Sequence, residues 1–150
     1  MPTKTFTADE TLQLDNQLCF ALYSASLAMT KLYKPLLKTL GLTYPQYLAM
    51  LVLWERDGLM VSELGERLYL DSGTLTPLLK RMETAGWISR QRDVQDERRV
   101  FITLTPAGRS LKTEAAKVPP CILSASQCSI PEITALTQQV QALRDRLTTA

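Results

Sequence analysis

The sequence has 150 residues, of which 45% are hydrophobic and 21% are charged, with a formal net charge of +2. This composition is ordinary for a folded protein, and the length suffices for one domain to bury a core without disulfides or metal. Three cysteines and no histidine argue against a zinc site, a disulfide framework or an ordinary hydrolase, so neither a metal nor a cofactor is expected.

The N-terminal segment Met1–Asp9 has no apolar signal-peptide core, and no apolar run is long enough to span a bilayer. We therefore expect a cytoplasmic protein with no membrane partner. In the cytoplasm the three thiols would normally stay reduced.

Two helical segments are predicted in the first third of the chain. Residues from about Asp9 to Thr39 are mostly helix-compatible, and Pro35 within them predicts a break or kink near Tyr33-Lys34. Thr43 then predicts the cap of a second helix, which should stop near Asp57-Gly58.

The stretch from Val61 to Leu104 has the pattern of a helix-turn-helix followed by a β-hairpin. A short helix from Ser62 leads through residues 69–73 into a second helix, whose apolar stripe should face the core. The stripe consists of Leu75, Leu78, Leu79 and Met82.

The opposite face of that second helix is polar and suits contacts with phosphates and base edges. Its candidate DNA-binding residues are Asp71, Ser72, Thr74, Thr76, Pro77, Lys80 and Arg81. Pro77 lies beyond the first turn and removes a backbone donor, so it should cost helix stability. A function on the exposed face and a simple kink explain this proline equally well.

Residues 88–92 and 100–104 predict a hairpin with a charged tip at residues 93–97. Its candidate DNA-binding residues are Arg90, Arg92, Asp96 and Arg98, with Arg99 adding to the local charge. Residues 80–112 hold eight Lys/Arg and four Asp/Glu, a net +4. Charged hairpins are usually only solvated, but one directly after a helix-turn-helix indicates a wing that contacts DNA beside the recognition helix.

The last helix has a clear start, because Ser129 and Glu132 form a capping-box pattern. Apolar residues then alternate spacings of three and four, an a/d seam. The seam consists of Ile133, Leu136, Val140, Leu143 and Leu147. It either packs on the N-terminal helix of the same chain or forms a subunit interface, as expected for a two-fold dimer on a palindromic site.

The sequence therefore predicts a mainly α protein with a small β-hairpin wing, organised as a single domain over residues 1–150. The winged helix-turn-helix should cover about residues 45–104. Helices for dimerisation and sensing should cover about residues 8–40 and 106–150.

Several segments closely resemble the organic hydroperoxide resistance regulators, a branch of the MarR repressors. They are Asp15–Tyr23, Leu42–Tyr47, Tyr69–Pro77 and Asp96–Arg98, and the resemblance extends over nearly the whole chain. The segment around Cys19 is specific to the branch, whereas the Asp-x-Arg pattern of the wing is shared across MarR proteins.

The resemblance implies a homodimeric repressor that leaves palindromic operator DNA when an organic hydroperoxide oxidises Cys19, so that a peroxide-detoxification gene is expressed. A thiolate attacks the peroxide oxygen and becomes sulfenic acid, which a second thiol can capture as a disulfide. In the family, two tyrosines of the partner subunit hydrogen-bond the reactive sulfur, and they match Tyr33 and Tyr44. Tyr23, one helical turn from Cys19, is a further candidate.

The second thiol departs from the family pattern, because the resolving residue would align with Ser124. Cys121 and Cys128 lie about one turn on either side of it, and all three share a face if the segment is helical. A helix would hold the two cysteines roughly 10 Å apart, too far for a mutual disulfide. We expect one of them to resolve Cys19 across the dimer, and the sequence does not decide which.

Two other functions compete with oxidative release. The chain could be a MarR-type repressor released by a non-covalent phenolic or drug-like ligand, with Cys19 merely buried. It could also be a thiol peroxidase, although a basic wing would have no role in such an enzyme.

Overall fold

The computed structural model describes residue 3 and residues 5–150, so Met1, Pro2 and Lys4 of the expected 1–150 domain lie outside the described residues. The helices are α1 (Ala8–Thr11), the 3-10 helix η1 (Leu14–Asn16), α2 (Leu18–Lys38), α3 (Tyr44–Glu55), α4 (Val61–Leu68), α5 (Ser72–Thr84), α6 (Pro106–Ala115), α7 (Val118–Ser126) and α8 (Ile130–Thr148). The strands are β1 (Leu59–Met60), β2 (Ile88–Arg92) and β3 (Val100–Leu104). The predicted mainly α class with a small hairpin is confirmed.

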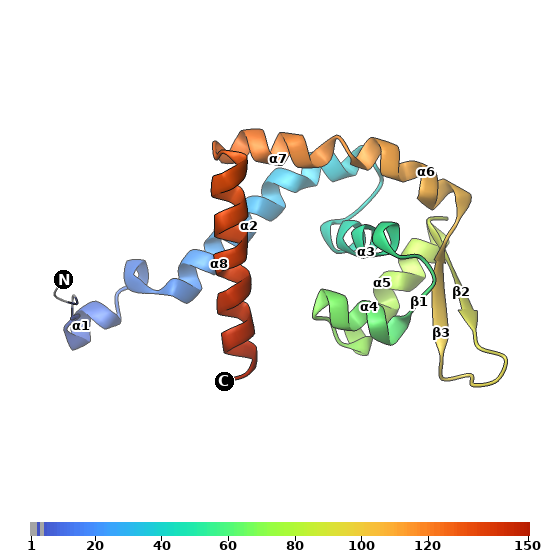
Figure 1. Ribbon diagram of the computed structural model, residues 1–150, viewed down its shortest axis with the longest axis horizontal. Helices are drawn as coiled ribbons and strands as arrows, with labels where there is room; N and C mark the ends of the chain where they lie inside the picture. The colour runs from blue at the N-terminus through green and yellow to red at the C-terminus, as the bar shows by residue number, and fades with distance from the viewer. Residues whose placement is uncertain (1–2, 4) are drawn as a thin grey trace.

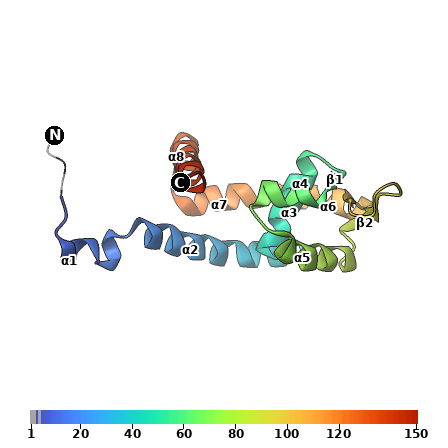
Figure 2. The same ribbon diagram turned by 90° about the horizontal axis from the view of Figure 1, so that it is seen from below.

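The chain divides into a compact unit, formed by helices α3 to α6 and the three strands, and an extended frame, formed by helices α1, α2, α7 and α8. Helices α3 to α6 gather around the strands, whereas α1 and α2 project away from them (Figure 1). Helix α8 crosses α2 in that view, but seen from below the two ribbons lie apart (Figure 2). Much of α2 and all of α8 therefore lie outside the compact unit.

Helix α2 runs unbroken from Leu18 to Lys38, so of the break or kink predicted near Tyr33-Lys34 the break is wrong. Pro35 removes one backbone hydrogen bond, but the turn after it buries Leu37, which is 1% exposed. The N-terminal irregularity comes earlier instead, between α1 and α2. There the side chains of Asn16 and Gln17 donate to backbone carbonyls that a continuous helix would use itself.

The sheet is antiparallel with strand order β1-β3-β2. The predicted hairpin has the expected bounds, and Ile88 pairs with Leu104 while Arg92 pairs with Val100. The short strand β1, which was not predicted, adds Leu59 opposite Ile102. This third strand ties the base of the wing to the helix-turn-helix.

The hydrophobic core lies almost wholly in the compact unit. The predicted stripe of α5 is buried, and Leu64 of α4 and Ile102 of β3 are 0% exposed. Leu37 is the one buried residue of α2, and α8 has none. The apolar faces of the frame are therefore largely exposed, although Leu22 of α2 and Leu143 of α8 are partly buried and line one shared cavity.

Close contacts hold the start of α6 against the rest of the compact unit. The indole nitrogen of Trp54 donates to the carbonyl of Gly108 at 2.9 Å. A side-chain carbon at Gly108 would collide with the carbonyl oxygen of Trp87, so only glycine fits there. The wing base and α3 thus fix the direction in which α6 leads toward α7.

Helix α7 is formed, and its two prolines lie in its first turn, where proline is tolerated. Cys121 lies within the helix, but the helix ends at Ser126 and Gln127 adopts a left-handed conformation with φ 57°. Cys128 therefore lies in the junction before α8. The conditional expectation that Cys121, Ser124 and Cys128 share one helical face fails for Cys128.

Candidate nucleic-acid interface and thiol site

The turn between α4 and α5 is short and fully hydrogen-bonded. The backbone N–H of Leu70 donates to Gly65 at 3.0 Å and that of Tyr69 donates to Glu66 at 3.4 Å, the pair of bonds that closes a Schellman motif. The carboxylate of Asp71 then accepts from the N–H of Thr74 at 2.8 Å and caps α5. Asp71, a predicted DNA contact, is thus also a structural cap.

The polar face predicted for α5 is exposed, with every proposed residue from Asp71 to Arg81 at the surface. The helix continues through Pro77. A proline inside a helix costs about 3 kcal/mol, which the burial of four large apolar side chains on the opposite face outweighs. The side chains that suit DNA contacts are therefore displayed by a helix whose other face is anchored in the core.

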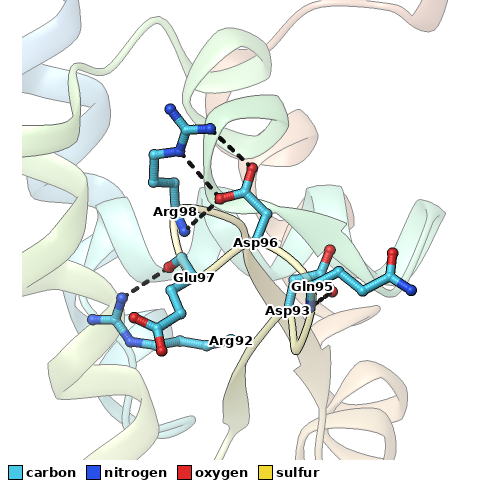
Figure 3. A network of polar contacts seen from close by, with 6 residues as sticks. All are labelled: Arg92, Asp93, Gln95, Asp96, Glu97 and Arg98. Carbon is cyan, nitrogen blue, oxygen red and sulfur yellow. Dashed lines mark hydrogen bonds and ion pairs between the residues drawn. The ribbon is translucent and has the colours of Figure 1, made fainter.

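The tip of the wing is held by its own charged residues (Figure 3). Asp96 accepts from the backbone N–H and the Nε of Arg98, both at 3.1 Å, and the hydrogen bond from the Arg98 side chain lowers the pKa of Asp96. Arg92 donates to the carbonyl of Glu97 at 3.0 Å. Arg98 remains 91% exposed, so an ordered tip presents its guanidinium to solvent.

A second ion pair joins the recognition helix to the wing. Glu83 of α5 accepts from the backbone N–H of Arg90 at 3.1 Å and from its guanidinium at 3.2 and 3.3 Å. The Arg90 side chain is only 26% exposed, and its hydrogen bond lowers the pKa of Glu83. Arg90, predicted as a DNA contact, is thus occupied within the protein and fixes the wing against α5.

A groove of about 790 Å³ lies between these elements and brings predicted residues from both together. From α5 it receives Ser72 and Thr76, and from the hairpin Arg90, Arg92, Arg98 and Arg99. Both Arg98 and Arg99 line this groove, although the sequence predicted a DNA contact only for Arg98. A concave basic surface flanked by an exposed helix face has the shape and charge for a nucleic-acid backbone.

The residues predicted to sense peroxide lie in two places on the chain. Cys19 is exposed in the first turn of α2, close to the exposed Tyr23. Tyr33 and Tyr44 lie together, with ring centroids 5.0 Å apart. Tyr47, which sequence reasoning missed because its spacing marks it as core, completes the cluster at 5.7 Å from Tyr33.

Burial raises the pKa of Tyr33 to about 12, with further contributions from Tyr47 and Tyr44. Its hydroxyl therefore remains a hydrogen-bond donor at neutral pH. Cys19 and Tyr33 are fourteen residues apart on one helix, a separation of roughly 21 Å. Within one subunit these two side chains cannot meet.

The other thiols are not paired in this structure. Cys121 is exposed and donates weakly to the carbonyl of Lys117, while Cys128 is half-buried and its backbone N–H donates to the Ser126 hydroxyl. Within the described residues, no three Cys, Asp or Glu side chains gather as metal ligands would. No helix in the described part of the chain is long and apolar enough to cross a membrane.

A helix-turn-helix followed by a basic hairpin defines the winged-helix class of transcriptional regulators. Residues 31–115 match the family described as transcriptional regulator SarA/Rot. The organic hydroperoxide resistance transcriptional regulator of Bacillus subtilis is 52% identical over 136 residues, covering 91% of this chain and 92% of the relative.

Two solved structures of AbfR, a protein of Staphylococcus epidermidis, are also similar. Reduced AbfR bound to DNA has a TM-score of 0.76 at 35% identity, covering 95% of this chain and 99% of that chain. Disulfide-formed AbfR has a TM-score of 0.61 at 38% identity, covering 90% and 95%. The arrangement of this chain is thus more similar to that of reduced, DNA-bound AbfR than to that of disulfide-formed AbfR.

The chain belongs to the MarR family of transcriptional regulators, in the branch of the organic hydroperoxide resistance regulators. The resemblance inferred from the sequence is confirmed. The relatives are regulators rather than enzymes, which excludes the thiol peroxidase alternative.

Proposed function

We propose that this protein is a homodimeric repressor that binds a palindromic operator in double-stranded DNA and leaves it when an organic hydroperoxide oxidises Cys19. Release would derepress a peroxide-detoxification gene in the cytoplasm. The proposed DNA binding rests on the basic groove between α5 and the wing, which is lined by Ser72 and Thr76 on one side and by four arginines on the other. The similar fold of DNA-bound AbfR supports the same assignment.

On the DNA side, α5 would enter the major groove with Thr74, Thr76, Pro77, Lys80 and Arg81 on its exposed face. The wing would contact the backbone or minor groove beside it through Arg92, Arg98 and Arg99. Arg90 and Asp96 would act mainly by holding the wing in position, because their side chains are engaged by Glu83 and Arg98.

The homodimer is supported by the apolar surface of the frame. Leu136, Val140 and Leu147 of α8 are 54%, 41% and 62% exposed, on a helix with no buried residue. Leu18 and Leu27 of α2 are similarly exposed. Contiguous exposed apolar faces of this kind mark interaction surfaces, and a second copy would supply matching faces through two-fold symmetry.

The dimer would also complete the sensing site. Because about 21 Å separates Cys19 from Tyr33 on α2, the tyrosines would reach the sulfur only from the partner subunit. Burial raises the pKa of Tyr33 to about 12, so the Tyr33 phenol would stay protonated and donate a hydrogen bond to the thiolate.

The proposed oxidation of Cys19 proceeds in two steps. The Cys19 thiolate attacks one peroxide oxygen, the O–O bond breaks, and an alcohol leaves after taking up a proton, so that Cys19 becomes sulfenic acid. A second thiol then displaces water from the sulfenic acid and forms a disulfide. Cys121 and Cys128 are the candidate second thiols, and the disulfide-formed AbfR structure supports such a step.

A DNA gel shift tests the proposal. The probe is a palindromic duplex that the reduced protein selects from a random library, and the oxidant is cumene hydroperoxide. Reduced protein should shift the duplex, hydroperoxide should abolish the shift, and dithiothreitol should restore it. A protein that binds no duplex, or stays bound after oxidation, contradicts the proposal.

Non-reducing gels of oxidised Cys121→Ser and Cys128→Ser identify the resolving thiol. One variant should lose the disulfide-linked dimer while the other keeps it. A linked dimer in both single variants, and also in the double variant, would show that neither cysteine resolves Cys19. If the wild type forms none, a small-molecule thiol would be the reductant.

A second candidate function is release by a non-covalent phenolic ligand. A cavity of about 430 Å³ beside Tyr44, lined also by Thr30, Leu37 and Leu42, favours it. The same gel shift distinguishes the two, because a non-covalent ligand such as salicylate would release DNA from the Cys19→Ser variant as well.

A further inference from the structure

Tyr69, in the turn before the recognition helix, has an unusual backbone conformation. Its φ of 57° places it in the left-handed region, which among the described non-glycine residues only Gln127 shares. A bulky side chain is disfavoured there, and glycine is the usual residue at this position of a Schellman motif. The hydrogen bonds of the Schellman motif hold this conformation, and a contact of the tyrosine ring would add to them.

The ring has such a contact with α8. The guanidinium carbon of Arg144 lies 4.7 Å from the centroid of the Tyr69 ring, within the range of a cation–π interaction. Arg144 is in turn oriented by Asp145, whose carboxylate accepts from its Nε at 3.2 Å and its Nη2 at 3.1 Å. The ring is otherwise 60% exposed, so this cation is its specific partner in the described structure.

The contact acts on a point that controls the direction of α5. Only Tyr69, Leu70 and Asp71 separate α4 from α5, and Asp71 caps α5 directly. A rotation of the backbone at Tyr69 would therefore tilt the whole recognition helix. Tyr69 also lines the basic groove, so the contact joins α8 to the proposed DNA surface itself.

We propose that Tyr69 and Arg144 are a positioning pair that fixes the recognition helix to α8 and so sets the separation of the two recognition helices in the dimer. The proposal rests on the proposed DNA-binding homodimer, in which the seam of α8 forms part of the interface. Both residues act through α5 and not through contact with DNA. Half-sites one helical turn apart require that separation to be well defined.

The test measures affinity for the selected palindromic duplex and for duplexes with one base pair added or removed between the half-sites. Arg144→Ala removes the cation, and Tyr69→Asn removes the ring while tolerating the left-handed conformation. Arg144→Lys and Tyr69→Phe retain a cation and a ring. Arg146→Ala is the matched control, since it removes the same charge from the same end of α8.

Arg144→Ala and Tyr69→Asn should each bind the selected duplex about tenfold more weakly, since two modest cation–π contacts are lost per dimer. Their preference for the selected spacing should fall by at least about threefold, because the recognition helices are less well placed. The double variant should be no weaker than either single variant. Tyr69→Phe, Arg144→Lys and Arg146→Ala should stay close to the wild type.

Unchanged affinity and spacing preference in Arg144→Ala, with wild-type protein that binds the duplex, overturns the positioning role. Additive losses in the double variant overturn it too, because they would mean that each residue contacts DNA separately. A wild-type protein that binds no duplex instead refutes the DNA-binding function on which the pair depends. Circular dichroism and thermal melting of Tyr69→Asn show whether a loss of binding comes from unfolding.

Discussion

The compact unit and the frame of this molecule bury their apolar residues to very different extents. Around the sheet and helices α3 to α5, many large apolar side chains are almost fully buried, among them Met50, Leu53 and Leu79. Helix α8 buries none of its residues, and α2 buries only Leu37. One chain can thus stabilise the compact unit by itself, whereas the proposed homodimer would cover the apolar faces of the frame with a second chain.

The functional residues follow the same division. The wing is ordered by pairs that close within one subunit, Glu83 with Arg90 and Asp96 with Arg98. Of the proposed sensing residues, Tyr33 and Tyr44 lie together, whereas Cys19 is roughly 21 Å from Tyr33 within one subunit. Changes in the wing should therefore alter DNA affinity directly, whereas changes in the frame should alter assembly or release and affect affinity only through them.

Cys19→Ser should have the largest effect on release and almost none on DNA affinity. Serine cannot form a sulfenic acid, so cumene hydroperoxide should leave the protein–DNA complex intact. Titrations of the operator duplex with and without oxidant measure both quantities. Wild-type protein kept in dithiothreitol is the control, and release of the variant by peroxide would show that another residue is the sensor.

Leu136→Glu should break the dimer without unfolding the compact unit. The side chain is 54% exposed in one chain, so a carboxylate costs little there, but it would be buried without a partner in a subunit interface. We expect monomers by light scattering and operator affinity lower by about a hundredfold or more, because the two half-sites are no longer bound together. Gln138→Glu, on the opposite face of α8, is the control. A Leu136→Glu protein that remains dimeric would place the interface elsewhere.

Arg98→Ala should weaken DNA binding by about tenfold and lower the salt dependence of binding by about one counterion per subunit. Its guanidinium is almost fully exposed at the wing tip, where it is positioned by Asp96. Fluorescence anisotropy at several salt concentrations measures both effects. The rate at which Cys19 reacts with peroxide should not change. An unaltered affinity would show that the hairpin is only a solvated loop.

Local signals in the sequence predicted the compact unit well. The helix cap at Thr43, the stripe of α5 and the bounds of the hairpin are all found in the structure. These features depend on neighbouring residues and on one buried face. The predicted break at Pro35 failed because the burial of Leu37 outweighs a local preference.

The residues of the candidate site could be predicted from the sequence, but most of the contacts between them could not. Nothing local in the sequence shows that Arg90 is held by Glu83, seven residues away on another element, or that Arg144 lies over Tyr69. Such pairs arise only when elements pack together. The position of Cys128 outside α7 likewise depends on the left-handed turn at Gln127, for which glycine would have been the usual signal.

Of these variants, Glu83→Gln should have the smallest effect, and the effect should be confined to the wing. The hydrogen bond from Arg90 lowers the pKa of Glu83, so the ion pair contributes stability above the pKa of the carboxyl in the unfolded chain and loses it as pH falls through the lower folded value. The protection factor of the Arg90 amide, which donates to Glu83, should therefore be constant in the wild type near neutral pH and fall once the pH drops below the ordinary pKa of a glutamate carboxyl, about 4.3.

In Glu83→Gln the protection factor of this amide should be lower than in the wild type at neutral pH, similar to that of the acidified wild type, and should lose the acid-dependent decline, because no carboxylate remains to be protonated. The pair is partly exposed, so the variant should lose less than about 1 kcal/mol of stability and change operator affinity by less than about threefold. Hydrogen exchange by NMR measures the amide. Glu97→Gln, which removes an equal charge from the wing tip, should leave the Arg90 amide unchanged. If both variants exchange like the wild type, the wing is held by β2–β3 pairing alone and Arg90 is available to contact DNA.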